Sequence, residues 1–238
     1  MSRRLTPAQQ RGVSVGVATG LYGISFGALA VVAGLNVWQA QALSLLMFTG
    51  GSQFAFIGVL AGGGTLGAAT AAASLLGVRN AVYGVTANAM LRPRGWQRAA
   101  AAQVTIDESI AVASGQEDPD EERRGFWAAG IAVFVLWNLC TLLGAALGDA
   151  LGDPKAWGLD GAAIAAFLGL LWPRLKSRDP IAIAVLAAVV TLLVAPFVPP
   201  GIPIIVAAAV SLACGFVVAR SSVPERTASA SEPPSKGP

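Results

Sequence analysis

Residues 68–90 read AATAAASLLGVRNAVYGVTANAM, an apolar stretch that is long enough to cross a bilayer and carries one charge, Arg79, near its middle. Arg79 is the only charged side chain between Gly12 and Leu91. A full charge in hydrocarbon costs about 2.5–3.5 kcal/mol even on insertion scales, so such a residue is usually paired and often functional. A side chain that snorkels to an interface, or a purely structural ion pair, is the alternative explanation of Arg79.

The composition is that of a membrane protein. Hydrophobic residues make up 55% of the 238 residues and charged residues 12%, which is about half the charged fraction of a typical soluble domain. The net charge is only +3, and the basic residues lie mainly between apolar segments, which argues against a nucleic-acid binder. The chain has no histidine, so any proton-coupled chemistry must use carboxylates. Cys140 and Cys214 lie in apolar runs and are expected to be core residues.

The apolar segments predict an all-α fold, a polytopic membrane helix bundle with seven or eight transmembrane segments, at least one of them interrupted. A spanning helix needs about 20 apolar residues, so the sixth candidate below is marginal and the fourth is doubtful. The candidates are Gly12–Leu35, Ala40–Ala61, Ala68–Met90, Arg98–Ser114, Phe126–Leu147, Leu159–Trp172, Pro180–Phe197 and Pro203–Ala219. Residues 1–11 are expected to be a cytoplasmic segment, residues 12–219 the transmembrane domain, and residues 220–238 a disordered tail.

The basic loops leave two topologies open. Eight spans with a cytoplasmic N-terminus leave Arg92, Arg94 and Arg98 outside, against the tendency of basic residues to stay in the cytoplasm. If the segment Arg98–Ser114 does not cross, these arginines move inside, but one earlier segment must then be re-entrant. The Gly50-Gly51 pair makes the second segment the candidate for re-entry.

The sequence Phe48-Thr49-Gly50-Gly51-Ser52-Gln53-Phe54 lies in the middle of the second segment. Its glycines and polar side chains predict a helix break at Gly50 and Gly51. Non-helical backbone at membrane depth is tolerated where it is buried in protein or lines a cavity, and transporters place such helix ends at the substrate. Ser52 and Gln53 are therefore candidates for binding a carboxylate or an ammonium group. A packed polar crossing between helices is the alternative.

Asp107 and Glu108 are adjacent carboxylates inside an apolar run. Burial raises the pKa of a carboxyl group, whereas a nearby guanidinium lowers it. We expect one of them to carry a proton or to act as the counter-ion of Arg79, and a water-facing position at an interface is the alternative. The acidic loop Gln116–Arg124 is expected to be a solvated connector.

Glycines recur at intervals of four residues in two of the predicted helices. Small residues at this spacing let helix backbones approach closely within a membrane. We expect these glycines to pack helices within one molecule, with oligomerisation as the alternative. They are Gly12, Gly16 and Gly20, Gly23 and Gly27, and Gly144, Gly148 and Gly152.

Sequence signatures of catalysis do not occur. Gly62-Gly63-Gly64-Thr65 lacks the lysine of a phosphate-binding loop, and there is no CxxC, HExxH or GxSxG sequence and no cluster of metal ligands. We therefore expect no enzyme, no cofactor and no metal site.

Three motifs together resemble the AzlC-type branched-chain amino acid permeases. Gly50–Phe54 resembles the Gly-Ala-Ser-Gln-Phe signature of that family, and Gly77–Gly84 is similar to its Asn-x-Arg-His-x-x-Tyr-Gly element. Thr105–Glu108 approximates its Thr-Asp-Glu stretch. The likeness covers residues 12–219. Two positions depart from the family pattern, since Gly77 replaces an asparagine and Asn80 a histidine.

The resemblance implies a secondary-active transporter that exports valine, leucine or isoleucine across a bacterial plasma (inner) membrane, with a small AzlD-like membrane protein as companion. The implied substrate-binding residues are Ser52, Gln53, Arg79, Asn80 and Tyr83, with Asp107 and Glu108 as coupling or counter-ion residues. A non-transporting membrane scaffold that stabilises a partner and a passive channel for small solutes are the alternative functions.

Overall fold

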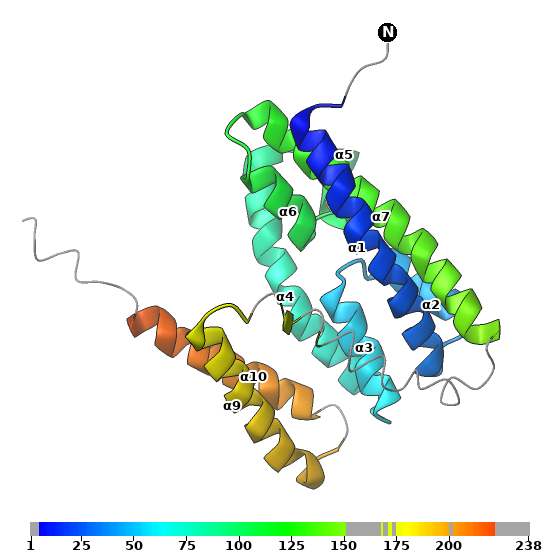
Figure 1. Cartoon of the computed structure of the whole chain (residues 1–238), viewed down its shortest axis with the longest axis vertical. Coiled ribbons are helices and arrows are strands. Elements are labelled where there is room, and N and C mark those ends of the chain that lie inside the picture. The colour runs from blue at the N-terminus through cyan, green and yellow to red at the C-terminus, as the bar shows by residue number, and fades with distance from the viewer. Residues whose placement is uncertain (1–4, 151–167, 169–170, 173–174, 200–201, 222–238) are drawn as a thin grey trace, which may run out of the picture. The chain divides into compact units, whose positions relative to one another are not determined.

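The computed structural model describes residues 5–150, 168, 171–172, 175–199 and 202–221. These residues are almost entirely helical, contain no strand and fall into two compact units. The first unit contains α1 (Pro7–Val32), α2 (Val37–Leu46), α3 (Gly51–Ala61), α4 (Leu66–Leu91), α5 (Trp96–Gln103), α6 (Asp107–Ser114) and α7 (Pro119–Ala150), labelled in Figure 1. The second contains α9 (Arg178–Val194), the 3-10 helix η3 (Ala195–Phe197) and α10 (Ile202–Ser221), with α9 packed on α10.

The helical membrane class predicted from the sequence is confirmed. Within the described residues, three helices are long and apolar enough to cross a bilayer, namely α1, α7 and Arg178–Phe197. Helix α4 is as long as α1, with 26 residues, but Arg79 and Asn80 make its middle more polar. The predicted segment Leu159–Trp172 and the predicted tail lie almost entirely outside the described residues, so the count of seven or eight crossings stays a prediction.

Two predicted boundaries are wrong because the helices extend further. Helix α1 begins at Pro7 and not at Gly12, since Thr6 caps it: the Thr6 side chain accepts a hydrogen bond from Gln9 N, and Thr6 N donates to Gln9 Oε1. Helix α7 begins at Pro119, so most of the acidic segment predicted as a connector forms the first turns of this helix. Carboxylates are favourable there because they complement the positive end of the helix dipole.

Helices α1 and α7 pack in parallel through the regularly spaced glycines. A methyl group at Gly12 would lie 2.7 Å from Ala129 N, and one at Gly23 would lie 2.5 Å from Trp137 O. A methyl group at Gly27 would collide with Thr141 O. Because the contact partners advance along both helices together, the two N-termini lie at the same end, as Figure 1 shows. The predicted intramolecular packing is confirmed for these glycines and for Gly144 and Gly148, whereas Gly152 lies outside the described residues.

The predicted second span is two short helices that form a hairpin. Helix α2 ends at Leu46 and α3 begins at Gly51, and at about 15 Å each neither is long enough to cross a bilayer. Gly51 faces Leu76 and Arg79 near the middle of α4, and α3 then runs back toward the start of that helix. The hairpin of α2 and α3 therefore reaches about halfway along the unit and then returns to the end of the unit at which α1 ends and α4 begins.

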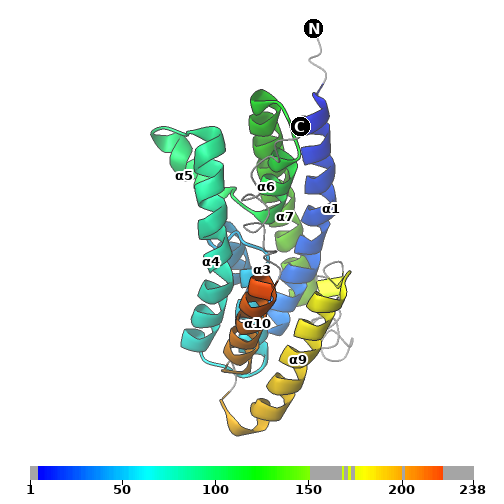
Figure 2. The ribbon, with the colours of Figure 1, turned by 90° about the vertical axis from the view of Figure 1, so that its left-hand side faces the viewer.

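The predicted fourth segment, Arg98–Ser114, is also not a single helix. Helices α5 and α6 have eight residues each and are separated by Val104-Thr105-Ile106. Methyl groups at Gly130 and Gly125 would contact Val104 and Val112, respectively, so α6 runs antiparallel to α7 and returns toward the α7 N-terminus. Figure 2 shows α5 at the upper end of α4 and α6 beside α7. This second hairpin enters from the opposite end.

The two hairpins remove the topological conflict found in the sequence. Gly115, just after α6, lies beside the Arg11 side chain, and Leu91 at the end of α4 lines the same groove as Arg123. The arginines after α4 therefore lie at the same end of the unit as those at the starts of α1 and α7. Residues 98–114 fold as two short helices, and the earlier segment 40–61 contains a helical hairpin, which is the helix geometry that the second topology requires. Which segments cross a bilayer stays a prediction.

The first six helices form two repeats of one long helix and two short ones. Helices α1–α3 and α4–α6 share this order, and their long helices run in opposite directions. The first short helix of each repeat contains Trp-Gln in its first turn, at Trp38 and Trp96. Thr49 and Thr105 each stand two residues before the second short helix. Inverted repeats of this kind place the substrate site of many secondary transporters near the bilayer midplane.

The close contact between α1 and α7 predicts that the stability of the protein depends strongly on the glycines between them. We expect Gly27→Ala to destabilise the protein by about 1–3 kcal/mol, because the methyl group meets the α7 backbone and the helices must separate. Gly84→Ala is the matched control, since no atom lies within 4 Å of a methyl group there. The measurement is thermal unfolding of the purified proteins in mild detergent. Equal unfolding midpoints for the two variants would contradict the packing.

The hairpin topology predicts which loops share a membrane face. In a background without Cys140 and Cys214, we expect Gln97→Cys and Asp118→Cys to react with an impermeant maleimide from one side. Gly64→Cys should react from the other side, because α4 separates residue 64 from residue 97. Labelling of inside-out and right-side-out vesicles makes the measurement. A crossing of residues 98–114 would instead place positions 97 and 118 on opposite sides.

Candidate functional site

Arg79 forms an ion pair with Asp107 at the point where the two hairpins meet. The Arg79 Nη1 atom lies 2.7 Å from Asp107 Oδ2, a short charge-assisted hydrogen bond. The side chains are 36% and 25% exposed, so solvent screens the charges of the pair only partly. Asp107 is the first residue of α6, where the positive end of the helix dipole also stabilises its charge. Of the two predicted carboxylates, Asp107 is the one that pairs with Arg79.

The start of α3 lies against the other side of the guanidinium. A methyl group at Gly51 would lie 3.4 Å from Arg79 Nη2, so the backbone at the beginning of α3 approaches the charge closely. Gly50 caps the helix with φ of +58°, a conformation that favours glycine. The Arg79 guanidinium therefore lies between the first turns of two half-helices, one with a carboxylate and one with bare backbone.

Hydrogen bonds between side chains and backbone hold the two hairpin tips together. Gln103 Nε2 donates to Leu45 O over 2.8 Å, which joins the end of α5 to the end of α2. Asn80 Nδ2 donates to Thr105 O over 3.3 Å, which joins α4 to the second break. Backbone groups freed by both breaks thus find partners within the protein, as non-helical backbone at membrane depth requires.

Three buried oxygens at these breaks have no hydrogen-bond partner in the described part of the chain. They are Gln53 Oε1, Asn80 Oδ1 and Thr49 Oγ1, and the Gln53 side chain is fully buried. Leaving a buried polar atom unpaired costs about 1–3 kcal/mol, so each such group calls for an explanation. An amide or hydroxyl oxygen can accept a hydrogen bond from an ammonium group.

The other predicted residues lie around this centre with different degrees of contact. Ser52 is buried, and its hydroxyl faces the space beside Gly77, where a methyl group would lie 3.6 Å away. Gln53 turns toward α2, since its Nε2 donates to Leu43 O. Tyr83 is half-buried one turn beyond Arg79, and its hydroxyl makes no hydrogen bond with a described residue. Glu108 is half-buried in the first turn of α6.

Sequence reasoning missed Thr49, Gln103 and Thr105 as parts of this centre. The second break does have a signal, because Val104-Thr105-Ile106 is a run of three β-branched residues, which have lower helix propensity. The carboxylates that follow this run mark the first turn of a new helix.

A second group of polar side chains joins α2 to α7. Gln41 Nε2 donates to Asn138 Oδ1 over 3.4 Å, and Ser44 Oγ donates to Thr141 Oγ1 over 3.3 Å. Ser44 and Thr141 are fully buried. These bonds fix α2 on α7 of the parallel pair.

Comparison with protein families identifies the region that holds this centre. Residues 14–151 match the model of a family described as AzlC protein, and this region spans most of α1 and all later helices up to α7. The chain belongs to the AzlC family. The match covers more than half of the 238 residues and includes both hairpins. Comparison with curated proteins and with solved structures gave no match.

Membership of the AzlC family places the chain among proteins associated with membrane transport. The three motifs that suggested this family all lie at the ion pair: Gly50–Phe54 begins α3, Gly77–Gly84 surrounds Arg79, and Thr105–Glu108 begins α6. Among the described residues, no group of three His, Cys, Asp or Glu side chains is placed to hold a metal ion.

The ion pair predicts that the effects of substituting Arg79 and Asp107 on stability are not additive. We expect Arg79→Gln and Asp107→Asn each to destabilise the protein by about 1–3 kcal/mol, because each leaves a charge without its partner. The double variant should be less destabilised than the sum of the two. Arg124→Gln is the control, since Arg124 pairs with Glu121 at the same 2.7 Å but with a side chain 51% exposed. Unfolding midpoints that are additive would show that the two charges do not interact.

Proposed function

We propose that this AzlC-family protein is a secondary-active transporter that exports branched-chain amino acids across a bacterial plasma membrane. The observation that carries the proposal is the Arg79–Asp107 pair, held between two half-helix starts near the middle of the long helices. Discontinuous helices at the interface of inverted repeats are the usual setting of a transporter substrate site.

The chemistry of this centre suits a zwitterion. Arg79 and the free backbone N–H groups at the start of α3 favour a carboxylate. Asp107 and the unpaired oxygens of Gln53 and Asn80 favour an ammonium group. The charges of Arg79 and Asp107 cancel, so a bound amino acid with one charge of each sign leaves the site neutral.

The surroundings of the hairpin tips suit an aliphatic side chain. A buried cluster with Phe26, Phe54 and Trp137 at its centre includes residues next to both breaks, Phe48 and Ile106. Its rings are 5.5–6.2 Å apart and form edge-on and stacked contacts. A substrate bound at the hairpin tips would find apolar contact for a branched side chain in this cluster but no partner for a polar one.

We further propose that Asp107 couples transport to protons. The chain has no histidine, and a charged Asp107 suits the substrate ammonium group, so protonation of Asp107 on the outer side would remove the partner of that group and favour its release. Loss of the proton on the inner side would restore the charge, so that substrate and proton bind in alternation and move in opposite directions. Glu108, in the same turn of α6, is the second candidate for this role.

Reconstituted vesicles test the function. In vesicles that contain the protein with an AzlD-like companion, we expect efflux of labelled valine, leucine and isoleucine. This efflux should accelerate when the medium outside the vesicles is made more acidic than the lumen. Arg79→Gln should slow efflux about ten- to hundredfold, because a hydrogen bond to a charged group contributes about 1.5–3 kcal/mol. Arg124→Gln should transport normally. Efflux that ignores the gradient would indicate a passive channel, and no efflux with any amino acid a scaffold.

The role of Asp107 is tested separately. We expect Asp107→Asn to lose acceleration by the proton gradient, since the substituted side chain cannot titrate, and to exchange labelled for unlabelled valine more slowly, since the ammonium group loses its carboxylate partner. Glu108→Gln is the matched comparison. A proton response that disappears only in Glu108→Gln would move the coupling role to Glu108.

A further inference from the structure

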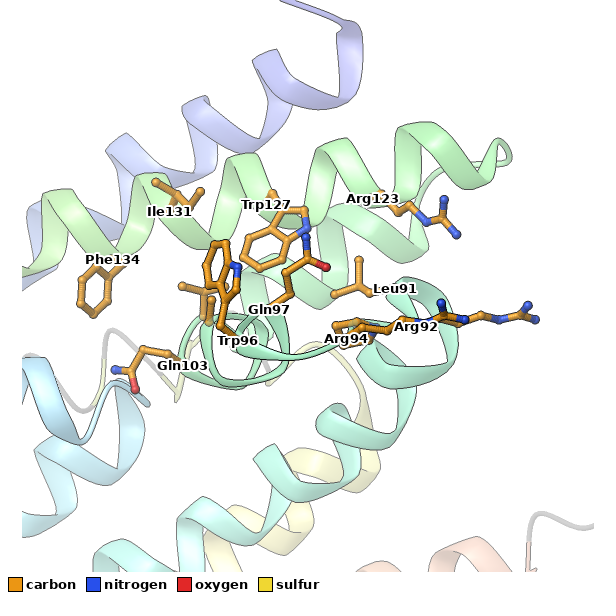
Figure 3. A pocket seen from close by; sticks show the side chains of 13 residues that line it. Leu91, Arg92, Arg94, Trp96, Gln97, Gln103, Arg123, Trp127, Ile131 and Phe134 are labelled. Atoms are coloured by element: carbon orange, nitrogen blue, oxygen red, sulfur yellow. The ribbon is translucent and has the colours of Figure 1, made fainter.

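A groove separate from the ion pair lies between the end of α4, helix α5 and the first half of α7. Its volume is about 710 Å³. Figure 3 shows the arginine side chains at one end of the groove and Phe134 at the other, with two tryptophans between them. The proposed transport mechanism does not use these side chains. The lining residues that matter here are Arg92, Arg94, Arg123, Trp127, Ile131 and Phe134.

One end of the groove has a strong positive charge. Arg92, Arg94 and Arg123 line it, and no Asp or Glu does. Arg123 has one acidic neighbour, with its Nη1 3.7 Å from Asp120 Oδ1, whereas Arg92 and Arg94 form no ion pair with a described residue. Arg92 also has φ of +46°, the only described residue other than glycine with a positive φ. A cluster in which two of three guanidinium groups have no ion-pair partner among the described residues fits an anion that is held by several arginines.

The other end of the groove is apolar and open to the side. Ile131 is 51% exposed and Trp96 is 78% exposed, and both stand on the outer surface of the membrane-embedded unit. From Arg123 to Phe134 the groove follows about 16 Å of α7, at 1.5 Å per residue. That length matches half of the hydrocarbon thickness of about 30 Å. Tryptophan is enriched at the interface between the hydrocarbon core of a membrane and water.

We propose that this groove binds an anionic phospholipid. The phosphate headgroup would bind the three arginines, and an acyl chain would follow Trp127, Ile131 and Phe134 toward the middle of the bilayer. The charge of the groove requires an anion, while its apolar lateral face requires a long hydrocarbon chain, and one lipid molecule supplies both. The apolar end reaches Gln103 and Val104, at the tip of the hairpin that holds Asp107, so the lipid would stabilise that hairpin.

The test uses the purified full-length protein in mild detergent, with dioleoyl phosphatidylglycerol as the probe and dioleoyl phosphatidylcholine as the uncharged-lipid control. Native mass spectrometry counts bound lipid, and thermal unfolding measures stabilisation. We expect phosphatidylglycerol to bind and to raise the unfolding midpoint. The double variant Arg92→Gln/Arg94→Gln should weaken binding about 25-fold, at about fivefold per arginine. Arg98→Gln, which removes an arginine on α5 that does not line the groove, should change binding less than twofold.

Two further measurements distinguish the occupants. Glycerol phosphate, which carries the anionic group without chains, should not compete, and Ala100→Trp, which fills the groove without changing its charge, should also weaken lipid binding. Equal binding of both lipids, equal losses in the double variant and in Arg98→Gln, or full competition by glycerol phosphate would each overturn the proposal. A photo-crosslinker at position 96 that captures the companion protein in native membranes in place of lipid would also overturn it.

Discussion

The close packing of α1 against α7 is the contact on which the remaining structure depends. Glycines bring the two backbones together in parallel, and no hydrophobic force could do this between helices that are surrounded by lipid. Phe26 of α1 and Trp137 of α7 then form one stacked pair, on which Phe54 of α3 packs edge-on. This contact anchors the first hairpin. A parallel pair also needs intervening elements that return the chain to its starting end, and α4 with the two hairpins does so.

The hairpins make it possible to hold a charge at the middle of the unit. A continuous helix beside Arg79 would offer only satisfied backbone groups, whereas a helix that begins there offers free N–H groups and a favourable position for a carboxylate. The first turn of α6 supplies Asp107, and the first turn of α3 supplies helix-end backbone beside the guanidinium of Arg79. The ion pair therefore depends on the two helix breaks, and the breaks place helix ends where they stabilise its charges.

The sequence predicted the first break, the membrane class and the glycine packing because each depends on local composition. Gly50 and Gly51 weaken a helix wherever they stand. The sequence also indicated Arg79, Asp107 and Asn80 as site residues, but it did not predict the contacts that join them. The second break was missed because no glycine or proline interrupts residues 98–114, and the β-branched run there only weakly disfavours a helix. The direction of each hairpin depends on contacts with α4 and α7, which lie far away in the sequence.

The two repeats differ at their tips, and that difference gives the two tips opposite electrostatic character. At equivalent positions the first repeat has Gly51 and the second has Asp107, each the first residue of its short helix. One tip therefore presents a bare, positive helix end and the other presents a carboxylate, with Arg79 between them. Two identical tips would have produced either two helix ends without a counter-charge or two carboxylates that repel each other. The charge distribution of the centre therefore depends on two differences between the repeats: Asp107 stands where the first repeat has Gly51, and Arg79 lies near the middle of α4, where the middle of α1 has no charged residue.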